Sequence, residues 1–399
     1  MGMKWEGKGF MESLPKIYAI YTGGFLAFFA LMAFFESLGM GPKWIGILFV
    51  LFTLVVYAFI GVLSRTTAVD AYYVAGRSVP PVFNGMATAA DWMSGASFVA
   101  MAGGIFMSGH PYMAFIVGWT GGYILIATLM APYLRKFGCY TVPDFIGTRY
   151  GGKLTRFCAI VVLVVASFTY VTAQITATGT IAARAFQIPF EVGVWLGLFG
   201  ILVCSMLGGM RAVTWTQVAQ YIVLIVAYLI PIFWMSIAQG FGFLPHLSYG
   251  SAVQRIMELE PIIGVGTAPT DTVAGLKALT TLHATPPEGA LAAWKFVTLV
   301  FCMMVGTASL PHILMRYFTT PSVRDARNSV AWSLFFIFLL YFSAPALATF
   351  SKLQMIDPNL PTSIIGASVD HVLSLEWIQK WSAIGLLAIK DSNADGILQ

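Results

Sequence analysis

The chain has 399 residues, of which 58% are hydrophobic and only 10% are charged, and its formal net charge is +5. Soluble domains carry about 25% charged residues, so this composition excludes an ordinary soluble protein and indicates a membrane protein. No Lys/Arg-rich run is present, which argues against nucleic-acid binding. The sequence also lacks a phosphate loop, a nucleophile elbow and zinc-ligand spacing, so we expect neither an enzyme nor a bound cofactor.

Nine apolar runs are close to the roughly 20 residues that a membrane-spanning helix needs. No small-residue cleavage site follows the first run, so we interpret it as a retained helix and not a signal peptide. A cytoplasmic N-terminus would place 14 of the 22 Lys and Arg residues in inner segments, as the positive-inside rule requires. We therefore predict a multi-pass protein of the cell (inner) membrane, with the C-terminus of this chain extracytoplasmic. The runs are Tyr18–Phe35, Trp44–Ser64, Val82–Gly109, Pro111–Leu134, Phe157–Ala183, Val192–Met210, Ala212–Gln239, Phe296–Met315 and Ser329–Ser351.

The third run contains Asp91, which is the only Asp, Glu, Lys or Arg within the nine predicted spans. A charge at the bilayer centre costs at least about 2.5 kcal/mol, so this carboxylate must face protein, water or an ion. Small and hydroxyl residues surround it in AADWMSGASF, Ala89 to Phe98. Such a sequence predicts an interrupted helix with free carbonyls that suit a hard cation such as sodium. The alternative is a packing face of small residues, with Asp91 hydrogen-bonded to a neighbouring helix.

A second interruption is predicted at VGTASLPHILMRYF, Val305 to Phe318. Pro311 removes a backbone donor in mid-membrane and frees a carbonyl. His312 follows directly and is either a packing residue or a ligand. Two interrupted helices, five spans apart, predict an all-α transporter built from two inverted halves with a midplane site. Counted from Val82, they are the first and sixth helices of a five-plus-five repeat.

The fifth span is rich in hydroxyls between Thr169 and Thr180, which either line a site or bond their own helix backbone. The four cysteines show no paired or metal-like spacing, and we expect free thiols. They are Cys139, Cys158, Cys204 and Cys302.

The last ten residues, KDSNADGILQ, match the first six positions of a calcium loop at Asp391, Asn393, Asp395 and Gly396. The twelfth position, which holds the bidentate ligand, would fall three residues beyond Gln399. A short acidic turn without calcium is the favoured alternative. Before it, Trp377, Trp381 and Leu386 form an amphipathic pattern that favours an interfacial helix over another span.

Three segments together resemble the sodium:solute symporter family, most closely its acetate-permease-like branch, over about Tyr18 to Ser351. They are DAYYVAGRSVPPVFNGMATAADWMSGASF, GWTGGYILIATLMAPYLRKFGCYTVPDF and GTASLPHILMRYFTTPSVRDARNSV.

The resemblance implies a sodium ion held by the backbone carbonyls of Ala90 and Met93, with Asp91 and Ser94 beside them. In this interpretation Asp91 tunes the site electrostatically or takes up a proton when the ion leaves. The resemblance also implies substrate-facing positions on the first break, on the next helix and on the second break. They are Gly95, Ser97, Trp119, Ser309, Leu310 and His312.

The branch is associated with acetate and similar short monocarboxylates, and some members are paired with a small membrane subunit. Half-helix N-termini and hydroxyls would hold a small anion, although no arginine lies within the predicted spans. We therefore expect a sodium-coupled symporter of a small organic solute. The alternatives are a sensor input domain of the same fold and a proton-coupled carrier that uses Asp91.

The expected organisation has a tail and two additional helices (1–81), a transporter core (82–351) and an extracytoplasmic segment (352–399). The family core has ten helices, of which seven are expected here, so the second repeat is expected to be incomplete. We predict that the 399-residue chain is a fragment. Expressed alone it should show no sodium-driven uptake, whereas a form extended through the remaining helices should transport.

Overall fold

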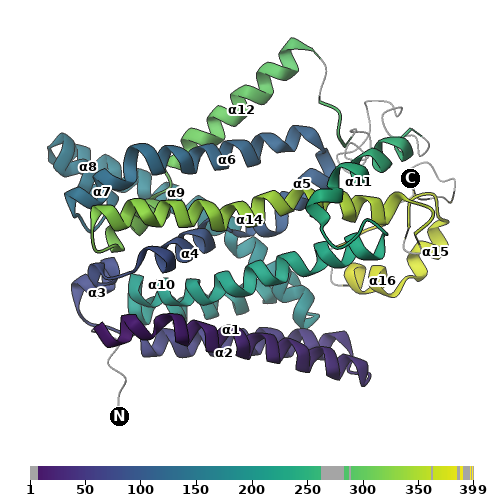
Figure 1. The fold of residues 1–399 in the computed structure, drawn as a ribbon, viewed down its shortest axis with the longest axis horizontal. Coiled ribbons are helices and arrows are strands. Elements are labelled where there is room, and N and C mark those ends of the chain that lie inside the picture. The colour runs from purple at the N-terminus through teal and green to yellow at the C-terminus, as the bar shows by residue number, and fades with distance from the viewer. Residues whose placement is uncertain are drawn as a thin grey trace. The chain divides into compact units, whose positions relative to one another are not determined.

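The computed structural model describes residues 8–261, 283–286, 289–360, 363–383, 387–389, 396 and 398, and every regular element in these ranges is helical (Figure 1). The long helices are α1 (Lys8–Ser37), α2 (Pro42–Leu63), α6 (Met113–Leu125), α9 (Lys153–Phe186), α10 (Phe190–Ala238), α11 (Pro245–Leu259), α12 (Ala290–Ala308) and α14 (Val323–Ile356). The shorter α-helices are α3 (Val69–Val74), α4 (Pro81–Trp92), α5 (Met101–Ser108), α7 (Ala131–Phe137), α8 (Val142–Tyr150), α13 (Pro311–Leu314), α15 (Val369–Ser374) and α16 (Glu376–Ala383).

Seven helices of the described chain are long and apolar enough to cross a membrane, where the sequence predicted nine spans. The two differences have identifiable causes. The predicted span Val82–Gly109 is divided between the short helices α4 and α5. The predicted spans Val192–Met210 and Ala212–Gln239 form the two parts of α10, which is kinked at Gly209 (φ 52°, ψ −144°). A Cβ at residue 209 would lie 2.5 Å from the carbonyl oxygen of Tyr72, so only glycine fits this kink.

The chain divides into two compact units, which we describe separately. Unit 1 contains residues 1–91, 134–224 and 315–333, and unit 2 contains residues 92–133, 225–314 and 334–399. The chain passes from one unit to the other at five points, and two of these lie between Asp91 and Trp92 and between Leu314 and Met315. These two passages fall at or next to the two predicted helix interruptions.

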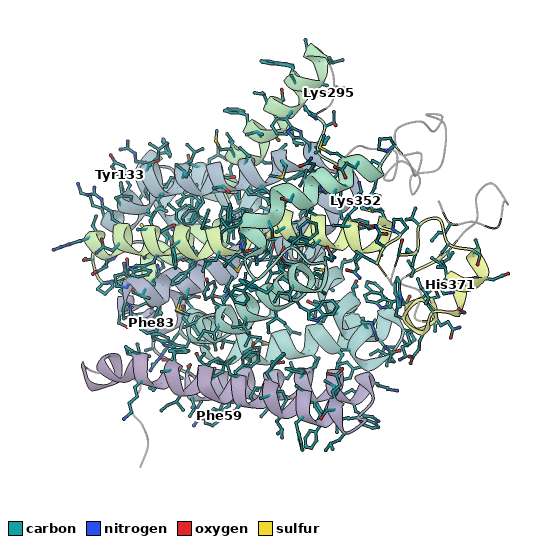
Figure 2. All side chains as sticks on the ribbon, turned by 45° about the vertical axis from the view of Figure 1, so that its right-hand side comes forward. Phe59, Phe83, Tyr133, Lys295, Lys352 and His371 are labelled. Carbon is teal, nitrogen blue, oxygen red and sulfur yellow. The ribbon has the colours of Figure 1, made fainter. Side chains whose placement is uncertain are left out.

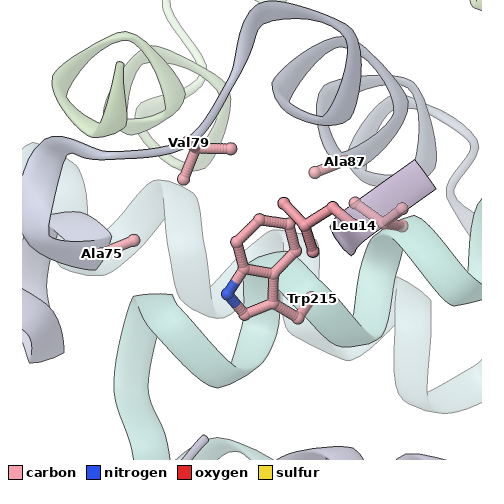
Figure 3. Close-up of a cluster of buried hydrophobic side chains, with 6 residues drawn as sticks. Leu14, Ala75, Val79, Ala87 and Trp215 are labelled. Atoms are coloured by element: carbon pink, nitrogen blue, oxygen red, sulfur yellow. The ribbon is translucent and has the colours of Figure 1, made fainter. Parts of the chain in front are cut away.

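The core of unit 1 packs the N-terminal helix α1 against α4 and α10. Trp215 of α10 lies among Leu14, Val79 and Ala87, all nearly fully buried (Figure 3). Tyr18 of α1 adds a polar contact, because its hydroxyl donates to the carbonyl of Trp215 at 2.9 Å. Burial of these apolar side chains fixes α1 to α4, the helix that carries Asp91.

Unit 2 contains a close helix pair, α6 and α12, with glycines on the α6 side. A Cβ at Gly118 would lie 2.5 Å from Cβ of Met303, and one at Gly122 would lie 2.7 Å from the carbonyl oxygen of Met304. Gly118 and Gly122 are one helical turn apart, which is the small-residue spacing that lets membrane helices approach closely. The absence of side chains on this face of α6 therefore determines where α12 lies.

Several helices expose apolar side chains over most of their length, as lipid-facing helices do. The most apolar 18-residue windows of α9 and α12 have no buried residues, whereas 44% of the α14 window is buried. Phe59 of α2, labelled in Figure 2, is 62% exposed. This supports a multi-pass membrane protein, in which such surfaces contact acyl chains.

After α14 the described chain forms only the short helices α15 and α16, of six and eight residues. Ile364, Val372 and Ile378 form a small buried cluster here. Trp377 and Trp381 lie on α16, which is too short to span a bilayer, and Leu386 lies outside the described residues. An interfacial location of α16 remains a prediction, as does the organisation into 1–81, 82–351 and 352–399.

Candidate functional site

The first predicted interruption is present. Helix α4 ends at Trp92. The next two residues, Met93 and Ser94, are not helical, and a π-helical turn then follows over Ala96–Ala100. The carbonyl of Ser94 accepts from the backbone N–H groups of Ser97 at 3.0 Å and Phe98 at 2.8 Å, which starts the new helix. Single π-turns occur frequently at functional sites because they interrupt the regular hydrogen-bond ladder.

The predicted cation-binding residues flank this break. Ala90 and Asp91 belong to unit 1, whereas Met93 and Ser94 belong to unit 2, as does Gly95, a predicted substrate residue. Their role in binding a cation remains a prediction.

The second interruption is also present. Helix α12 ends at Ala308. The next two residues, Ser309 and Leu310, are not helical, and Pro311 begins α13. Proline suits this first helical position because its missing N–H would have no partner there. The exposed Ser309 donates its hydroxyl to the carbonyl of Gly306 at 2.8 Å, so it caps its own helix. Leu310 and His312 are half-buried, and their substrate role remains a prediction.

The carboxylate of Asp91 is held within unit 1 by two side chains from distant parts of the chain. Arg316 donates through Nε to one oxygen, and Gln217 donates through Nε2 to the other. The side chains of Arg316 and Asp91 are only 1% and 10% exposed. Asp91 is therefore neutralised by an ion pair that is almost completely removed from solvent.

Two hydroxyl groups complete this arrangement. Thr214 accepts from Nη1 of Arg316 at 2.8 Å, and its own hydroxyl donates to the carbonyl of Met210 at 2.7 Å. Tyr170 of α9 donates to the carbonyl of Asp91 at 3.4 Å. The end of α4 is thus tied to α9, to α10 and to the turn after α13. We call Asp91, Arg316, Gln217, Thr214 and Tyr170 the Asp91 cluster.

Asp91 is the only charged residue within the nine predicted spans, but it pairs with an arginine that lies just outside them. Arg316 lies one residue beyond the predicted end of its span at Met315, in a 3₁₀ turn (Met315–Thr319) whose last four residues are all buried. The absence of an arginine from the predicted spans therefore does not keep a guanidinium away from the first break. A buried guanidinium is present, and it lies against the carboxylate that the sequence analysis singled out.

Asn84 explains why this turn lies beside α4. Its side chain accepts from the hydroxyl of Thr319 at 3.0 Å and donates to Ser329 at 3.2 Å. The backbone N–H of Val79 also donates to the carbonyl of Thr319 at 3.2 Å. These buried bonds hold the Arg316 turn against the start of α4.

Two of the predicted substrate residues lie beside Tyr341 in unit 2. Ser97 is 3% exposed, its hydroxyl donates to the carbonyl of Trp92 at 2.9 Å, and it lies 3.2 Å from the hydroxyl of Tyr341 on α14. The ring of Trp119 lies 6.2 Å from that of Tyr341. Sequence reasoning missed Tyr341, although it is the one tyrosine in the phenylalanine-rich stretch FFIFLLYF.

The threonine hydroxyls of the fifth span bond their own helix. Five threonines of α9 each donate to the carbonyl four residues earlier, at 2.9 to 3.0 Å, which confirms that alternative. They are Thr169, Thr172, Thr176, Thr178 and Thr180.

Other predicted ligands are not supported or fall outside the structure. Asp391, Asn393 and Asp395 lie outside the described residues. In the described part of the chain, no group of three or more His, Cys, Asp or Glu side chains could hold a metal ion. Cys139, Cys158 and Cys302 are free thiols, as predicted, and the side chain of Cys204 is not described.

A second buried ion pair was not predicted. In unit 2, Nζ of Lys352 donates to Oε1 of Glu260 at 2.7 Å, and their side chains are 2% and 1% exposed. The same oxygen accepts from the backbone N–H of His283 at 2.9 Å. Nε2 of His283 lies 3.1 Å from the hydroxyl of Thr349. We call these four residues the Lys352 cluster, after the residue labelled in Figure 2.

The environment of His283 affects its charge. Burial, and then the nearby ammonium of Lys352, lower the pKa of His283 to about 4. The imidazole is therefore neutral at neutral pH. Elsewhere in unit 2, burial raises the pKa of Asp357, but hydrogen bonds from Arg255 and Asn359 outweigh it and lower this pKa below its ordinary value.

Residues 72–371 match the sodium:solute symporter family. An uncharacterised symporter of Cupriavidus necator is 37% identical, over 98% of this chain and 69% of that protein. A monocarboxylic acid transporter of Corynebacterium glutamicum is 26% identical, over 81% of this chain and 57% of that protein. The chain thus spans about two thirds of the length of the first relative and a little more than half of the second.

A solved structure of a Na⁺-coupled sialic acid symporter, in a substrate-bound outward-open state, resembles this chain with a TM-score of 0.57. The two are 17% identical, and the match covers 80% of this chain and 62% of that one. This likeness shows the fold, which is the inverted-repeat transporter fold predicted from the two broken helices.

Proposed function

The chain belongs to the sodium:solute symporter family, and from this premise we propose that it is a secondary active transporter that moves a small organic solute together with sodium. The observation that carries the proposal is the pair of helix breaks, at Met93–Ser94 and at Ser309–Leu310. Broken helices offer unpaired backbone carbonyls and half-helix ends at membrane depth, which suit a cation and a small anion. As a family of transporters, these proteins are not enzymes.

We place sodium at the first break, with the carbonyls of Ala90 and Met93 as ligands and Asp91 and Ser94 beside them. The ion pair with Arg316 supports sodium over a proton as the coupling ion. Protonation of Asp91 would leave the guanidinium buried without its counter-charge, at a cost of about 3–5 kcal/mol. Asp91 then acts by positioning the end of α4 and by balancing the positive charge of Arg316 near the ion.

We place the solute near Ser97, Trp119 and Tyr341, with Gly95, Ser309, Leu310 and His312 as further candidates. The best-supported solute class is acetate or a similar short monocarboxylate, because a relative is named a monocarboxylic acid transporter. Hydroxyl donors and half-helix N-termini can hold a small carboxylate. Insertion in the cell membrane with a cytoplasmic N-terminus, and pairing with a small membrane subunit, remain proposals from the sequence.

The test is uptake of labelled acetate by vesicles in which sodium and proton gradients are imposed separately. The 399-residue chain is compared with a form continued by the C-terminal part of the Cupriavidus relative, so that a missing element cannot mask the activity. Uptake that follows the sodium gradient supports the proposal. Uptake that follows only the proton gradient contradicts the choice of coupling ion, and the absence of uptake of any monocarboxylate contradicts the solute class.

A further inference from the structure

A cavity of about 340 Å³ lies in unit 1, next to the Asp91 cluster. It is lined by residues of α2, α9 and α10, and its walls are largely apolar, as at Val50, Leu54 and Ile181. None of the described residues that line it is charged. Its volume falls in the range of small-molecule sites, roughly 300–1,000 Å³.

Two polar atoms of residues that line the cavity have no hydrogen-bond partner among the described residues. They are Oγ1 of Thr216, in a side chain 5% exposed, and Oε1 of Gln217. Thr216 differs from Thr178 and Thr214, whose hydroxyls bond their own helix backbone. A buried polar group without a partner costs about 1–3 kcal/mol, so two adjacent ones indicate a missing ligand.

The hydrogen-bonding role of Gln217 is determined by its other contact. Its Nε2 donates to the carboxylate of Asp91, which can only accept, so its oxygen is left as an acceptor that needs a donor. The hydroxyl of Thr216 can both donate and accept. The pair therefore complements a head group that has one O–H donor and one carbonyl acceptor.

We propose that this cavity binds an undissociated monocarboxylic acid of medium chain length. The acid O–H donates to Oε1 of Gln217, the hydroxyl of Thr216 donates to the acid carbonyl, and the alkyl chain lies along the apolar wall. The ionised acid is not held, because the described lining residues supply no cation to balance it.

The bilayer supplies this ligand. The most apolar windows of α2 and α9, two of the helices that form the cavity, are only 6% and 0% buried. Uncharged medium-chain acids partition into a bilayer, whereas their anions stay in water. The bound acid would contact Gln217, so only the side chain of Gln217 would separate it from the carboxylate of Asp91.

The test measures binding, so it does not depend on transport. The purified chain is labelled with a photoreactive analogue of octanoic acid at pH 5 and at pH 7, and the labelled peptides are identified by mass spectrometry. For a carboxyl pKa of about 4.3, the undissociated fraction is roughly 80-fold larger at pH 5. Labelling should fall on α2, α9 and α10 and should be much stronger at pH 5, and 1-octanol should compete equally well at both pH values.

Two variants and one matched control test the geometry. Thr216→Val removes the unpaired hydroxyl at constant shape and should weaken octanoic acid binding about 3- to 10-fold, with a melting temperature no lower than that of the parent chain. Thr178→Val removes a hydroxyl that lines the same cavity but is already bonded, and should leave binding unchanged. Leu196→Trp fills the cavity from a position that is 42% exposed and should abolish labelling.

Equal labelling at both pH values would overturn the proposal, as would unchanged binding in Thr216→Val. Recovery of a phospholipid that is displaced by Leu196→Trp would also overturn it, because the occupant would then be a lipid.

Discussion

The Asp91 cluster and the Lys352 cluster each contain a buried ion pair, but their surroundings differ. Asp91 lies at the last turn of an interrupted helix, and its carboxylate accepts from a guanidinium and an amide. Glu260 follows the end of α11, and a single oxygen of its carboxylate accepts from both Lys352 and the backbone N–H of His283. The backbone carbonyl of His283 in turn accepts from the backbone N–H of His110 at 2.8 Å.

The buried ion pair serves a different purpose in each of the two clusters. In the Lys352 cluster the charges fix loop backbone to the end of a long helix, which is a structural use. In the Asp91 cluster the charges hold a helix that stops in mid-membrane, where backbone atoms become available to a ligand. We therefore expect changes in the Lys352 cluster to affect stability, and changes in the Asp91 cluster to affect sodium coupling.

The largest effect is expected for Lys352→Met, which leaves Glu260 buried without its counter-charge. Loss of one partner of a buried pair costs about 3–5 kcal/mol. The double variant Glu260→Gln/Lys352→Met should recover much of this loss, because it removes both charges. Unfolding in detergent, followed by circular dichroism, measures both variants. Lys380→Met, in the exposed pair with Glu376, is the control and should leave the unfolding transition unchanged.

The second effect concerns pH and again belongs to the Lys352 cluster. The pKa of His283 is about 4 in the folded protein and about 6.5 when unfolded, so the unfolded state binds more protons between these values. The stability contribution is complete above pH 6.5 and is lost as the pH falls toward 4, by about 3 kcal/mol at most.

Melting temperatures between pH 4.5 and 7.5 measure this loss. His283→Gln should flatten the dependence, whereas His371→Gln, at an exposed position, should not. An identical pH profile in His283→Gln would show that another group is responsible.

The third effect tests the Asp91 cluster. Asp91→Asn should raise the sodium concentration for half-maximal uptake about tenfold, because the positive charge of Arg316 beside the proposed cation is then no longer balanced. Asp91→Glu should restore part of the affinity. Asp144→Asn breaks an exposed pair with Arg156 and should leave sodium activation unchanged. The assignment would be contradicted by normal sodium activation in Asp91→Asn at normal expression.

The smallest effect compares two hydroxyls on α14. Tyr341→Phe removes the partner of Ser97 and should raise the KM for the solute about 3- to 5-fold, since one hydrogen bond contributes roughly 0.5–1.5 kcal/mol. Thr349→Val removes the partner of His283 and should lower the melting temperature without changing KM. The opposite pattern would contradict both the proposed solute site beside Tyr341 and the structural use of the Lys352 cluster.

The helical fold and both interruptions could be predicted from the sequence because they depend on local composition. Asp91, the small residues around it and Pro311 each act within one turn of helix. Ser97 and Trp119 were expected from the resemblance to face the substrate, and each lies beside Tyr341. Tyr341 itself was not expected, because its contact joins residues 244 positions apart.

The buried cations were missed for one specific reason. The two predicted spans concerned end directly before a basic residue, at Met315 and Ser351, which Arg316 and Lys352 follow. The helical structure and the burial continue beyond both points, to Thr319 and to Ile356. Hydropathy counts a lysine or arginine at a span end as an aqueous anchor, and only tertiary contacts show that it has a buried counter-charge.

The glycine face of α6 has a consequence for how this protein can change in evolution. Helix α12 should accept many apolar replacements at outward residues such as Trp294 and Phe301, which are 69% and 61% exposed. On its other side, any residue larger than glycine at 118 or 122 would collide with Met303 or Met304 and displace the helix that leads into the second break. Sequences related to this one should therefore drift freely along one face of α12 while glycine persists at these two positions of α6.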